Sequence, residues 1–473
     1  MGIPTDDNAS STYSSAADRA ARGKAARAEV PRRVHGEWEP PRHRSDPVEL
    51  LEEQARTRVA ELVPIRYGRM LISPFTFFRG AAYLMASDLA GGPRTGLHAQ
   101  LCGDAHLSNF GVFAAPDRRL VFSVNDFDET LPGPFEWDLK RLVASFAVAA
   151  RDRGFDAKLR SRINTTVSSS YRQAMHEFAA RGNLDVWYTR TDVDEITREY
   201  RRQASATQRA RAEKGLAKAR AKDSLRAFSK LTHLVDGEPR IVSDPPLIVP
   251  VDEFVQPSEK ERMYDAFQIL MSRYRRTLPH DRRRLLERYR FVDAAQKVVG
   301  VGSVGTRAWI VLLVGRDIHD PLFLQAKEAE ASVLEPFLGR SEFTNHGQRV
   351  VEGQRLMQAA SDIMLGWLHT SDIDGVDRNF YLRQLWDAKG SADTDSMEPN
   401  TMAMYANLCG SALANAHARS GDPIAIANYL GSGAACDKAF NAFAELYADQ
   451  NEKDYLALKR AVASGRVKAE PGR

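Results

Sequence analysis

Two stretches decide the expected fold: residues 102–109 read CGDAHLSN, and residues 124–129 read VNDFDE. Each ends a short apolar run, at 97–104 and at 118–126, so we expect two strands that flank a polar loop. Phosphoryl transfer needs a carboxylate that orients or deprotonates the attacking hydroxyl, and amide and carboxylate oxygens that hold magnesium against phosphates. A loop with Asp and then Asn, followed by a strand that ends in Asp-Phe, supplies these groups.

This loop resembles the catalytic loop of the aminoglycoside and choline kinase branch of the protein-kinase-like superfamily, which reads His-Gly-Asp-x-His-x-x-Asn. By that resemblance Asp104 is the catalytic base, His106 shapes the loop, and Asn109 and Asp126 bind magnesium, with Asp128 as a further metal ligand. The alternative is a polar turn in which Asp104 and Asn109 only satisfy backbone groups.

The surroundings of the loop depart from that branch in one place and agree in another. Cys102 stands where the branch has its first histidine, a change that removes no ligand. The adjoining stretch PGPFEWDLKRL resembles the segment that opens the next helix in small-molecule kinases. We expect Asp138 in this stretch to be a structural anchor at a helix start and not a catalytic group.

A second motif, GVGSVG at 300–305, precedes Lys327 in the stretch LFLQAKEA. Glycines let a backbone approach phosphates closely, and a lysine on the next strand can reach the α- and β-phosphates. A strand follows these glycines where a dinucleotide site would start a helix, which favours a kinase-like hairpin over a Rossmann turn. A solvated strand-edge lysine remains the alternative for Lys327. The expected nucleotide-binding residues are Gly300, Gly302, Ser303, Gly305 and Lys327.

A kinase lysine needs a carboxylate partner from the following helix, which we expect at about 348–368. Glu352 would share an inward face of that helix with Leu356, Ala359 and Ile363, and we choose it as the catalytic partner of Lys327. Glu328 and Glu330 compete for this role, and an ordinary surface glutamate is the alternative.

Kinases place the glycine loop before the catalytic loop, whereas this chain has the reverse order. The sequence therefore predicts a helix-rich α/β (α+β) fold of two protein-kinase-like lobes that is circularly permuted. We expect a disordered basic arm at 1–45, a helical lobe with the catalytic loop and metal-binding aspartate at 46–290, a small β-rich lobe with the glycine-rich loop and lysine at 291–395, and C-terminal helices at 396–473 that pack on the helical lobe.

Local patterns predict several elements within these units. Asp46 and Pro47 should open the first helix, and a second helix should run through FFRGAAYLMASDLA. We expect strands in KVVGVGSVGTRAWIVLLVG from Lys297 onward, in PLFLQAKEA and in FYLRQLW. The C-terminal part should contain a helix with one apolar stripe that includes Tyr405 and Leu413.

Composition limits the class of protein. The chain has 473 residues, of which 43% are hydrophobic, and no apolar run approaches the length of a membrane-spanning helix. Three cysteines without a CxxC pair suit a reducing compartment, so we expect a cytoplasmic protein without a membrane partner. The net charge of +4 makes nucleic acid an improbable partner. Residues 198–222 hold nine basic and two acidic side chains, which we interpret as a solvated helix or linker; a polyanion-binding helix is the alternative.

At a larger scale the chain is similar to a bacterial family filed as domain of unknown function 2252. The similarity covers nearly everything after residue 45 and includes RYGRMLISPFTFFRGAAYLMASDLA, NDFDETLPGPFEWDLKRL, AHARSGD and YADQNEKDY. This family implies no established reaction.

Taken together, the motifs predict an enzyme: an ATP- and Mg²⁺-dependent phosphotransferase that acts on an unknown small-molecule or protein hydroxyl. The alternatives are a nucleotide-binding regulatory module without turnover and a metal-dependent hydrolase that would use Asp104, His106, Asp126 and Asp128 as metal ligands. We expect structural ion pairs for Arg79 and Arg383, with contacts to phosphate or substrate as the alternative. For His417 we expect a satisfied helix-end role; contact of His417 and Asp422 with the site is the alternative.

Overall fold

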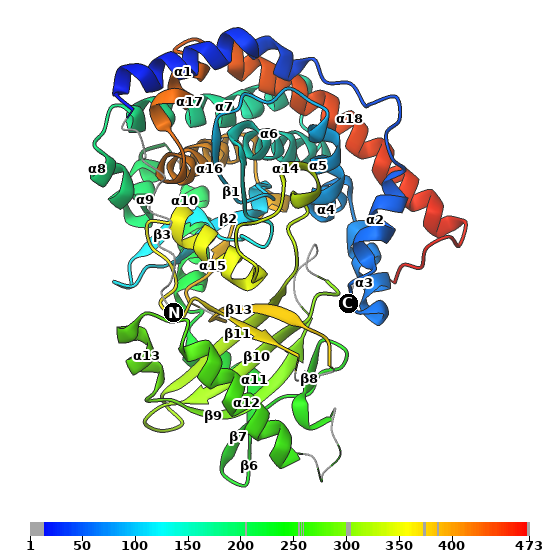
Figure 1. Cartoon of the computed structure of the whole chain (residues 1–473), viewed down its shortest axis with the longest axis vertical. Coiled ribbons are helices and arrows are strands. Elements are labelled where there is room, and N and C mark those ends of the chain that lie inside the picture. Colours follow the sequence, from blue (N-terminus) through cyan, green and yellow to red (C-terminus); the bar gives the residue numbers. More distant parts are fainter. Residues whose placement is uncertain are drawn as a thin grey trace, which may run out of the picture.

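The computed structural model describes residues 14–470 except 204–205, 254–255, 257, 259, 299–303, 372–374 and 386. The fold is mixed α/β, 54% of it helical, and each described strand pair is antiparallel. Helices fill the upper half of Figure 1, and the largest sheet lies in the lower half. No helix in these described ranges combines the length and the apolar character needed to cross a membrane.

Four long helices form the core of the helical half. One of them is buried over almost its whole length, from Phe135 to Ala150, because it lies at the centre of the other three. The apolar stripe expected around Tyr405 and Leu413 is buried against this bundle. The four helices are α6 (Phe135–Asp152), α7 (Ala157–Ala179), α16 (Pro399–Ser420) and α18 (Ala435–Ala463).

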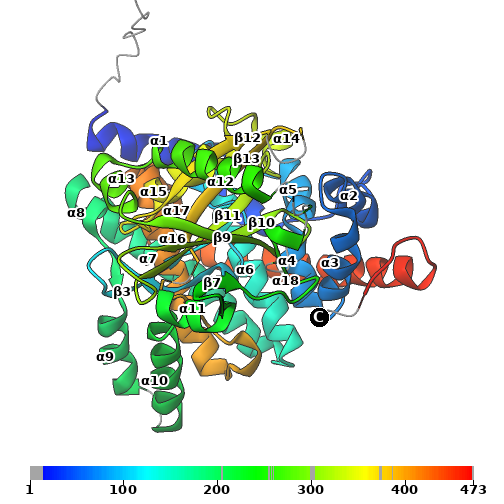
Figure 2. The same ribbon diagram turned by 90° about the horizontal axis from the view of Figure 1, so that it is seen from below.

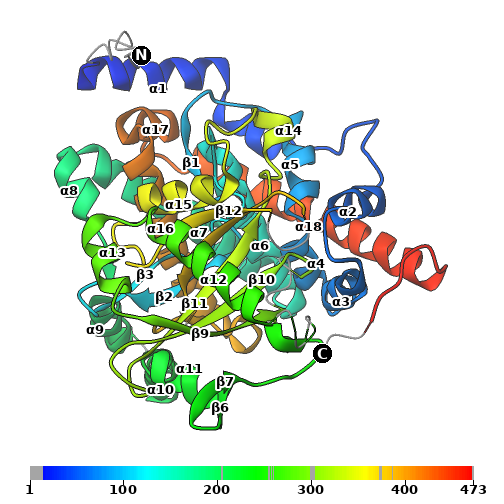
Figure 3. The same cartoon turned by 60° about the horizontal axis from the view of Figure 1, so that its bottom comes forward.

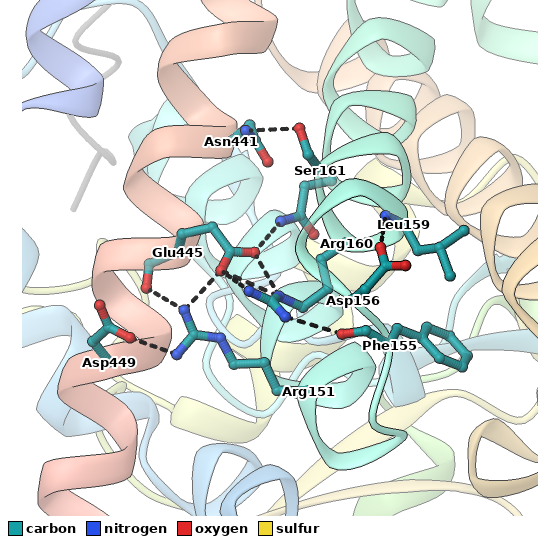
Figure 4. Close-up of polar contacts among 10 residues, drawn as sticks. Arg151, Phe155, Asp156, Leu159, Arg160, Ser161, Asn441, Glu445 and Asp449 are labelled. Carbon is teal, nitrogen blue, oxygen red and sulfur yellow. Dashed lines mark hydrogen bonds and ion pairs between the residues drawn. The ribbon is translucent and has the colours of Figure 1, made fainter.

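A polar network joins α18 to α6 and α7 (Figure 4). The Glu445 carboxylate accepts hydrogen bonds from Arg151 at 2.7 Å and from Arg160 at 3.2 Å, and Arg151 also reaches Asp449 at 2.6 Å. Asp156 caps the start of α7 by accepting from the Leu159 N–H at 2.8 Å. Since these side chains come from three helices, the network fixes how the helices cross.

The N-terminal segment is ordered, which corrects the expected disordered arm for residues 14–45; residues 1–13 lie outside the described ranges. It forms α1 (Ala16–Glu29) and a 3-10 helix, η1 (Arg32–Gly36), that pack on α17 (Pro423–Leu430) and α18. A Cβ on Gly23 would lie 2.1 Å from the Ala425 carbonyl oxygen, so only glycine permits this approach. Arg32 donates to the Leu430 carbonyl at 2.7 Å. Such tertiary contacts order a segment that lacks apolar periodicity.

The next segment begins as the sequence predicts, because Asp46 caps the first helix through the Glu49 N–H at 2.9 Å. The single helix expected through FFRGAAYLMASDLA is instead two helices with a break at Ala81. The buried Arg66 side chain donates to the Gly80 carbonyl at 3.0 Å, so this carbonyl has a partner outside the helix. The helices are α2 (Pro47–Ala55), α3 (Val63–Met70), α4 (Pro74–Gly80) and α5 (Ala82–Ala90).

Small antiparallel pairs carry the polar loop. The two expected flanking strands are present, and an additional strand at 110–114 lies between them. Residues 102–109 follow the first strand, and residues 125–130 connect the third strand to the fourth. Strand β1 (His98–Leu101) pairs with β4 (Leu131–Pro134), and a second sheet has the order β14 (Gly390–Ser391), β2 (Phe110–Ala114), β3 (Leu120–Val124) and β5 (Thr191–Asp192).

The largest described sheet has six strands and confirms the strands expected in RAWIVLLVG, PLFLQAKEA and FYLRQLW. The strand expected from Lys297 onward is placed too late, because the observed strand covers Arg290–Lys297. Alternate side chains of the inner strand β10 (Ala308–Val314) face opposite sides of the sheet. Val311 and Leu313 pack against α12 (Lys260–Arg275), and Ile310 and Leu312 pack against α11 (Ser224–Leu231). Figure 3 shows α12 across one face. The strand order is β12 (Gly366–Thr370), β13 (Arg378–Gln384), β11 (Pro321–Ala329), β10 (Ala308–Val314), β9 (Arg290–Lys297) and β8 (Ile248–Pro250).

The helix expected at 348–368 is shorter: α15 (His346–Met357) ends eleven residues early and strand β12 follows. Asp362 causes the turn, because its carboxylate accepts from the Met364 N–H at 2.8 Å and from the Gln384 N–H at 2.6 Å. Ala359 and Ile363 are therefore not on a helix with Glu352.

The basic segment forms α9 (Val193–Gln203) and α10 (Ala206–Arg220), which project from the body in Figure 2. The remaining short elements are α8 (Asn183–Tyr188), α13 (His280–Leu286), α14 (Glu335–Leu338), β6 (Thr232–Val235) and β7 (Glu238–Ile241).

Candidate functional site

A cavity of about 620 Å³ lies where the polar loop, the end of α4 and the end of β11 meet. Both sequence motifs reach this region, since residues 102–109 and 126–129 line it together with residues 328–331 that follow Lys327. The sequence-predicted residues that line it are Asp104, His106, Asn109, Asp126 and Asp128.

Asp138 anchors the polar loop at residues 102–103, which confirms the structural role expected for this residue. Its carboxylate accepts from the Cys102 N–H at 2.7 Å and from the Gly103 N–H at 3.1 Å. His417 places its Nε2 at 3.3 Å from the same carboxylate and its Nδ1 at 2.9 Å from the Tyr171 hydroxyl. The histidine is thus satisfied within the core and does not face the cavity.

Glycine at position 103 is required by the close approach of two loop segments. Its φ is +82°, and a Cβ there would lie 2.3 Å from the Glu129 carbonyl oxygen.

Asp422 lies away from the loop. It caps α17 by accepting from the Ile424 N–H at 3.1 Å, and it pairs with Arg19 at 3.0 Å.

The candidate base Asp104 is held by Arg141, whose Nε donates to Asp104 Oδ1 at 2.6 Å. The Arg141 guanidinium also lies over the Phe78 ring, 4.3 Å from its centroid, and donates to the Phe78 carbonyl at 2.9 Å. Burial raises the pKa of Asp104 and Arg141 partly counters this, so the net shift is upward. The carboxylate is therefore oriented by a buried cation.

Two other loop residues lie beside Asp104. Asn109 donates its side-chain N–H to the Asp104 carbonyl at 2.8 Å, which orients the asparagine amide. His106 Nε2 lies 3.7 Å from Asp104 Oδ2. Burial holds the pKa of His106 well below its ordinary value, and the cations Arg79 and Arg141 lower it further, so the imidazole is neutral.

Lys327 contacts the 124–129 stretch through Asp128, which lies 199 residues earlier in the sequence. Its Nζ lies 2.5 Å from Asp128 Oδ2 and 3.9 Å from Asp126 Oδ1. Burial alone would lower the pKa of Lys327, but the two carboxylates outweigh it and hold the pKa above its ordinary value. The Tyr381 hydroxyl donates to Asp128 Oδ1 at 2.5 Å, so both carboxylate oxygens of Asp128 have protein donors.

Asp126 differs from Asp128 because its buried Oδ1 accepts no hydrogen bond within the described residues and lies 3.9 Å from the Lys327 ammonium. A buried carboxylate oxygen without a hydrogen bond is unfavourable, and a closer cation or donor would satisfy it. Among the described residues, no group of three or more His, Cys, Asp or Glu side chains is arranged to hold a metal ion. Mg²⁺ commonly uses one or two carboxylates, waters and substrate phosphates, and Asp126 beside Asn109 fits that pattern better than a tightly bound transition metal.

The expected pairing of Glu352 with Lys327 is wrong. Glu352 is half-exposed and pairs with Arg355 on its own helix at 3.1 Å, while Lys327 is already matched by carboxylates from the 126–128 segment. Helix α15 contributes Arg349 instead, which donates to the carbonyl of Asp128 at 2.8 Å. The competing residue Glu328 pairs with Arg307 at 3.3 Å and with Arg378 at 3.1 Å.

The predicted residues Gly300, Gly302 and Ser303 lie outside the described ranges. Gly305 is described, with a φ of +94°, and its carbonyl accepts from the Val59 N–H at 2.8 Å. Arg58 donates to the neighbouring Val304 carbonyl at 2.6 Å. The end of the glycine-rich segment is thus attached to the chain just after α2.

Two residues of this region were missed from the sequence. Arg141, which holds the candidate base, lies one helical turn after Asp138, so the motif PGPFEWDLKRL contained a signal for it. Glu129 lines the cavity, and burial raises its pKa to about 7, although its carboxylate accepts from the Val333 N–H at 2.8 Å.

The structural ion pair expected for Arg383 is not found within the described residues. Its side chain instead donates to the Asn125 carbonyl at 3.4 Å.

A family model described as "Uncharacterized protein conserved in bacteria (DUF2252)" matches residues 58–461. No curated protein and no solved structure matches the chain. The matched range includes the polar loop, the strand that carries Lys327 and the residues that line the cavity, apart from Glu53, Gln54 and Thr57.

Proposed function

The chain belongs to this bacterial family, DUF2252, and we propose that it is an ATP- and Mg²⁺-dependent phosphotransferase whose two halves form a circularly permuted, kinase-like fold. The observation that carries the proposal is the contact of the buried Lys327 with Asp128 and Asp126, two carboxylates that line the cavity together with Asp104. A base and a metal-binding carboxylate in one cavity, with a lysine directly behind its wall, are groups of the kind that phosphoryl transfer needs.

In this proposal the chain's own residues have separate tasks. Asp104 orients the acceptor hydroxyl and accepts its proton. Asp126 and Asn109 hold Mg²⁺, which when bound neutralises charge on the phosphates. Lys327 lies against the phosphate side, and Asp138 fixes the loop that carries the base by holding its backbone.

One observation favours the alternative of a regulatory module without turnover. The Arg141 guanidinium donates to Asp104 Oδ1 at 2.6 Å and so occupies one of the two oxygens that would accept the proton of an acceptor hydroxyl. The metal-dependent hydrolase lacks comparable support, because the described residues contain no cluster of three or more ligands suited to a tightly held metal.

The decisive experiment compares the unmodified protein with Asp104→Asn. We expect both to bind ATP with Mg²⁺, and we expect phosphate transfer to water or to a panel of hydroxyl acceptors to fall on the order of 10²–10⁴-fold in the variant. Full activity of Asp104→Asn would show that another group is the base. ATP binding by the unmodified protein without transfer to any acceptor would instead favour the regulatory module.

A further inference from the structure

The cavity contains three arginines, and they differ in how their charges are used. Arg58, Arg79 and Arg340 line it, with Arg340 exposed at its rim. Lys327 is already neutralised by two carboxylates, at 2.5 and 3.9 Å. The cavity cations that are not neutralised by two close carboxylates are therefore the arginines. Arg58 and Arg79 are largely enclosed, whereas Arg340 is exposed.

Arg58 lies at the side of the cavity where the glycine-rich segment ends. One of its terminal nitrogens donates to the Val304 carbonyl at 2.6 Å. Its Nε is buried and has no hydrogen-bond partner within the described residues. Burial lowers the pKa of Arg58 and nearby Glu330 partly offsets this, yet a guanidinium stays protonated in proteins.

Arg79 lies in the last turn of α4 and lines the cavity together with the loop that carries Asp104. The structural ion pair expected for it is not formed within the described part of the chain, where no hydrogen bond or salt bridge to its side chain is found. Its Nε is buried without a partner. Burial lowers the pKa of Arg79, and the fields of Asp104 and Asp126 act in the opposite direction.

The unpaired N–H groups of Arg58 and Arg79 are energetically unfavourable, because buried polar groups are nearly always hydrogen-bonded. Both arginines line one cavity, so a single ligand with several anionic oxygens can contact both guanidinium groups. Guanidinium groups bind phosphate oxygens through two parallel N–H donors, which gives charge and geometry together.

We propose that Arg58 and Arg79 are the phosphate-binding cations of this cavity, and that together they clamp a polyphosphate chain. Arg58 holds the phosphates next to the glycine-rich segment, and Arg79 holds the terminal phosphate beside Asp104. The proposal deepens the phosphotransferase function and rests on it only for the identity of the ligand as a nucleotide. Lys327, held by Asp128, then has a lesser part in binding.

The test is calorimetric titration with two probes, ATP with Mg²⁺ and inorganic tripolyphosphate with Mg²⁺. The proteins are the unmodified chain, Arg79→Gln, Arg58→Lys and the control Arg316→Gln, which removes an arginine charge whose side chain is 80% exposed in the β10–β11 turn. We expect Arg79→Gln to weaken binding of both probes on the order of 10- to 100-fold, as for a lost charge-assisted hydrogen bond. Arg58→Lys, which keeps the charge without the fork, should weaken it by about tenfold.

Thermal unfolding separates binding from structure. Arg79 forms no described hydrogen bond, so Arg79→Gln should leave the ligand-free Tm unchanged or raise it, whereas loss of a structural residue would lower it. Binding of both probes unchanged in Arg79→Gln and Arg58→Lys would overturn the clamp while leaving the phosphotransferase proposal intact. Binding of tripolyphosphate but not ATP, lost in the arginine variants, would support the clamp and refute the nucleotide. Binding of neither probe would refute both.

Discussion

Replacing Asp138 with Asn should destabilise the protein by removing one of the two carboxylate oxygens that accept backbone N–H groups of the polar loop. The carboxylate accepts from Cys102 N–H at 2.7 Å and Gly103 N–H at 3.1 Å with separate oxygens, but an asparagine amide offers only one oxygen. The second buried N–H then faces an amide N–H donor. An orphaned buried donor costs about 1–3 kcal/mol, and exchanging charged for neutral hydrogen bonds adds about 1 kcal/mol.

The assay is equilibrium unfolding in denaturant, with the free energy of unfolding compared at constant slope. The matched control is Asp156→Asn, because Asp156 caps α7 through one N–H, and asparagine caps a helix equally well. We expect a loss of about 2–4 kcal/mol for Asp138→Asn and less than about 0.5 kcal/mol for the control. Equal, small losses in both variants would show that Asp138 does not anchor the loop.

Three further predictions follow from single contacts. Gly103→Ala should lower the free energy of unfolding by more than about 1 kcal/mol, because the new Cβ would meet the Glu129 carbonyl oxygen at 2.3 Å with φ at +82°; a denaturant titration that finds no change contradicts the loop geometry. Lys327→Met should lower stability and also weaken binding of ATP, because it leaves two neighbouring carboxylates unmatched, whereas intact stability measured by thermal unfolding would argue against the ion pair. Burial lowers the pKa of Lys140 from 10.5 to about 8, so between these pH values the unfolded chain binds more protons than the folded chain. The free energy of unfolding should therefore rise with pH in that window. The rise should be smaller in Lys140→Met when unfolding is followed from pH 7 to 10.5.

The sequence predicted the elements whose signals are local. The strands at 308–314 and 321–329, the cap at Asp46 and the buried stripe on α16 follow from residue types at regular spacing. The meeting of the 102–109 and 126–128 segments in one cavity was also expected, because both follow strands of one unit.

The sequence did not predict features that depend on long-range contacts. The order of residues 14–45 comes from hydrogen bonds to α17, some 400 residues away in the chain, which no local pattern reveals. Glu352 had the expected helical position, but a nearer arginine pairs with it and Asp128 takes the lysine. Arg58 is joined to the glycine-rich segment only through tertiary structure, so nothing in its own surroundings indicated a place in the cavity.

The central claim, a magnesium-dependent nucleotide site in this cavity, is tested most directly by titrating ATP into the protein with and without Mg²⁺, alongside Asp126→Ala. Asp126 carries the buried carboxylate oxygen that lacks a donor within the described residues, so its removal should abolish the magnesium-dependent part of binding. The account predicts ATP binding that requires Mg²⁺ in the unmodified protein and is lost in the variant. Absence of binding in the unmodified protein, or equal magnesium-dependent affinity in Asp126→Ala, would contradict it.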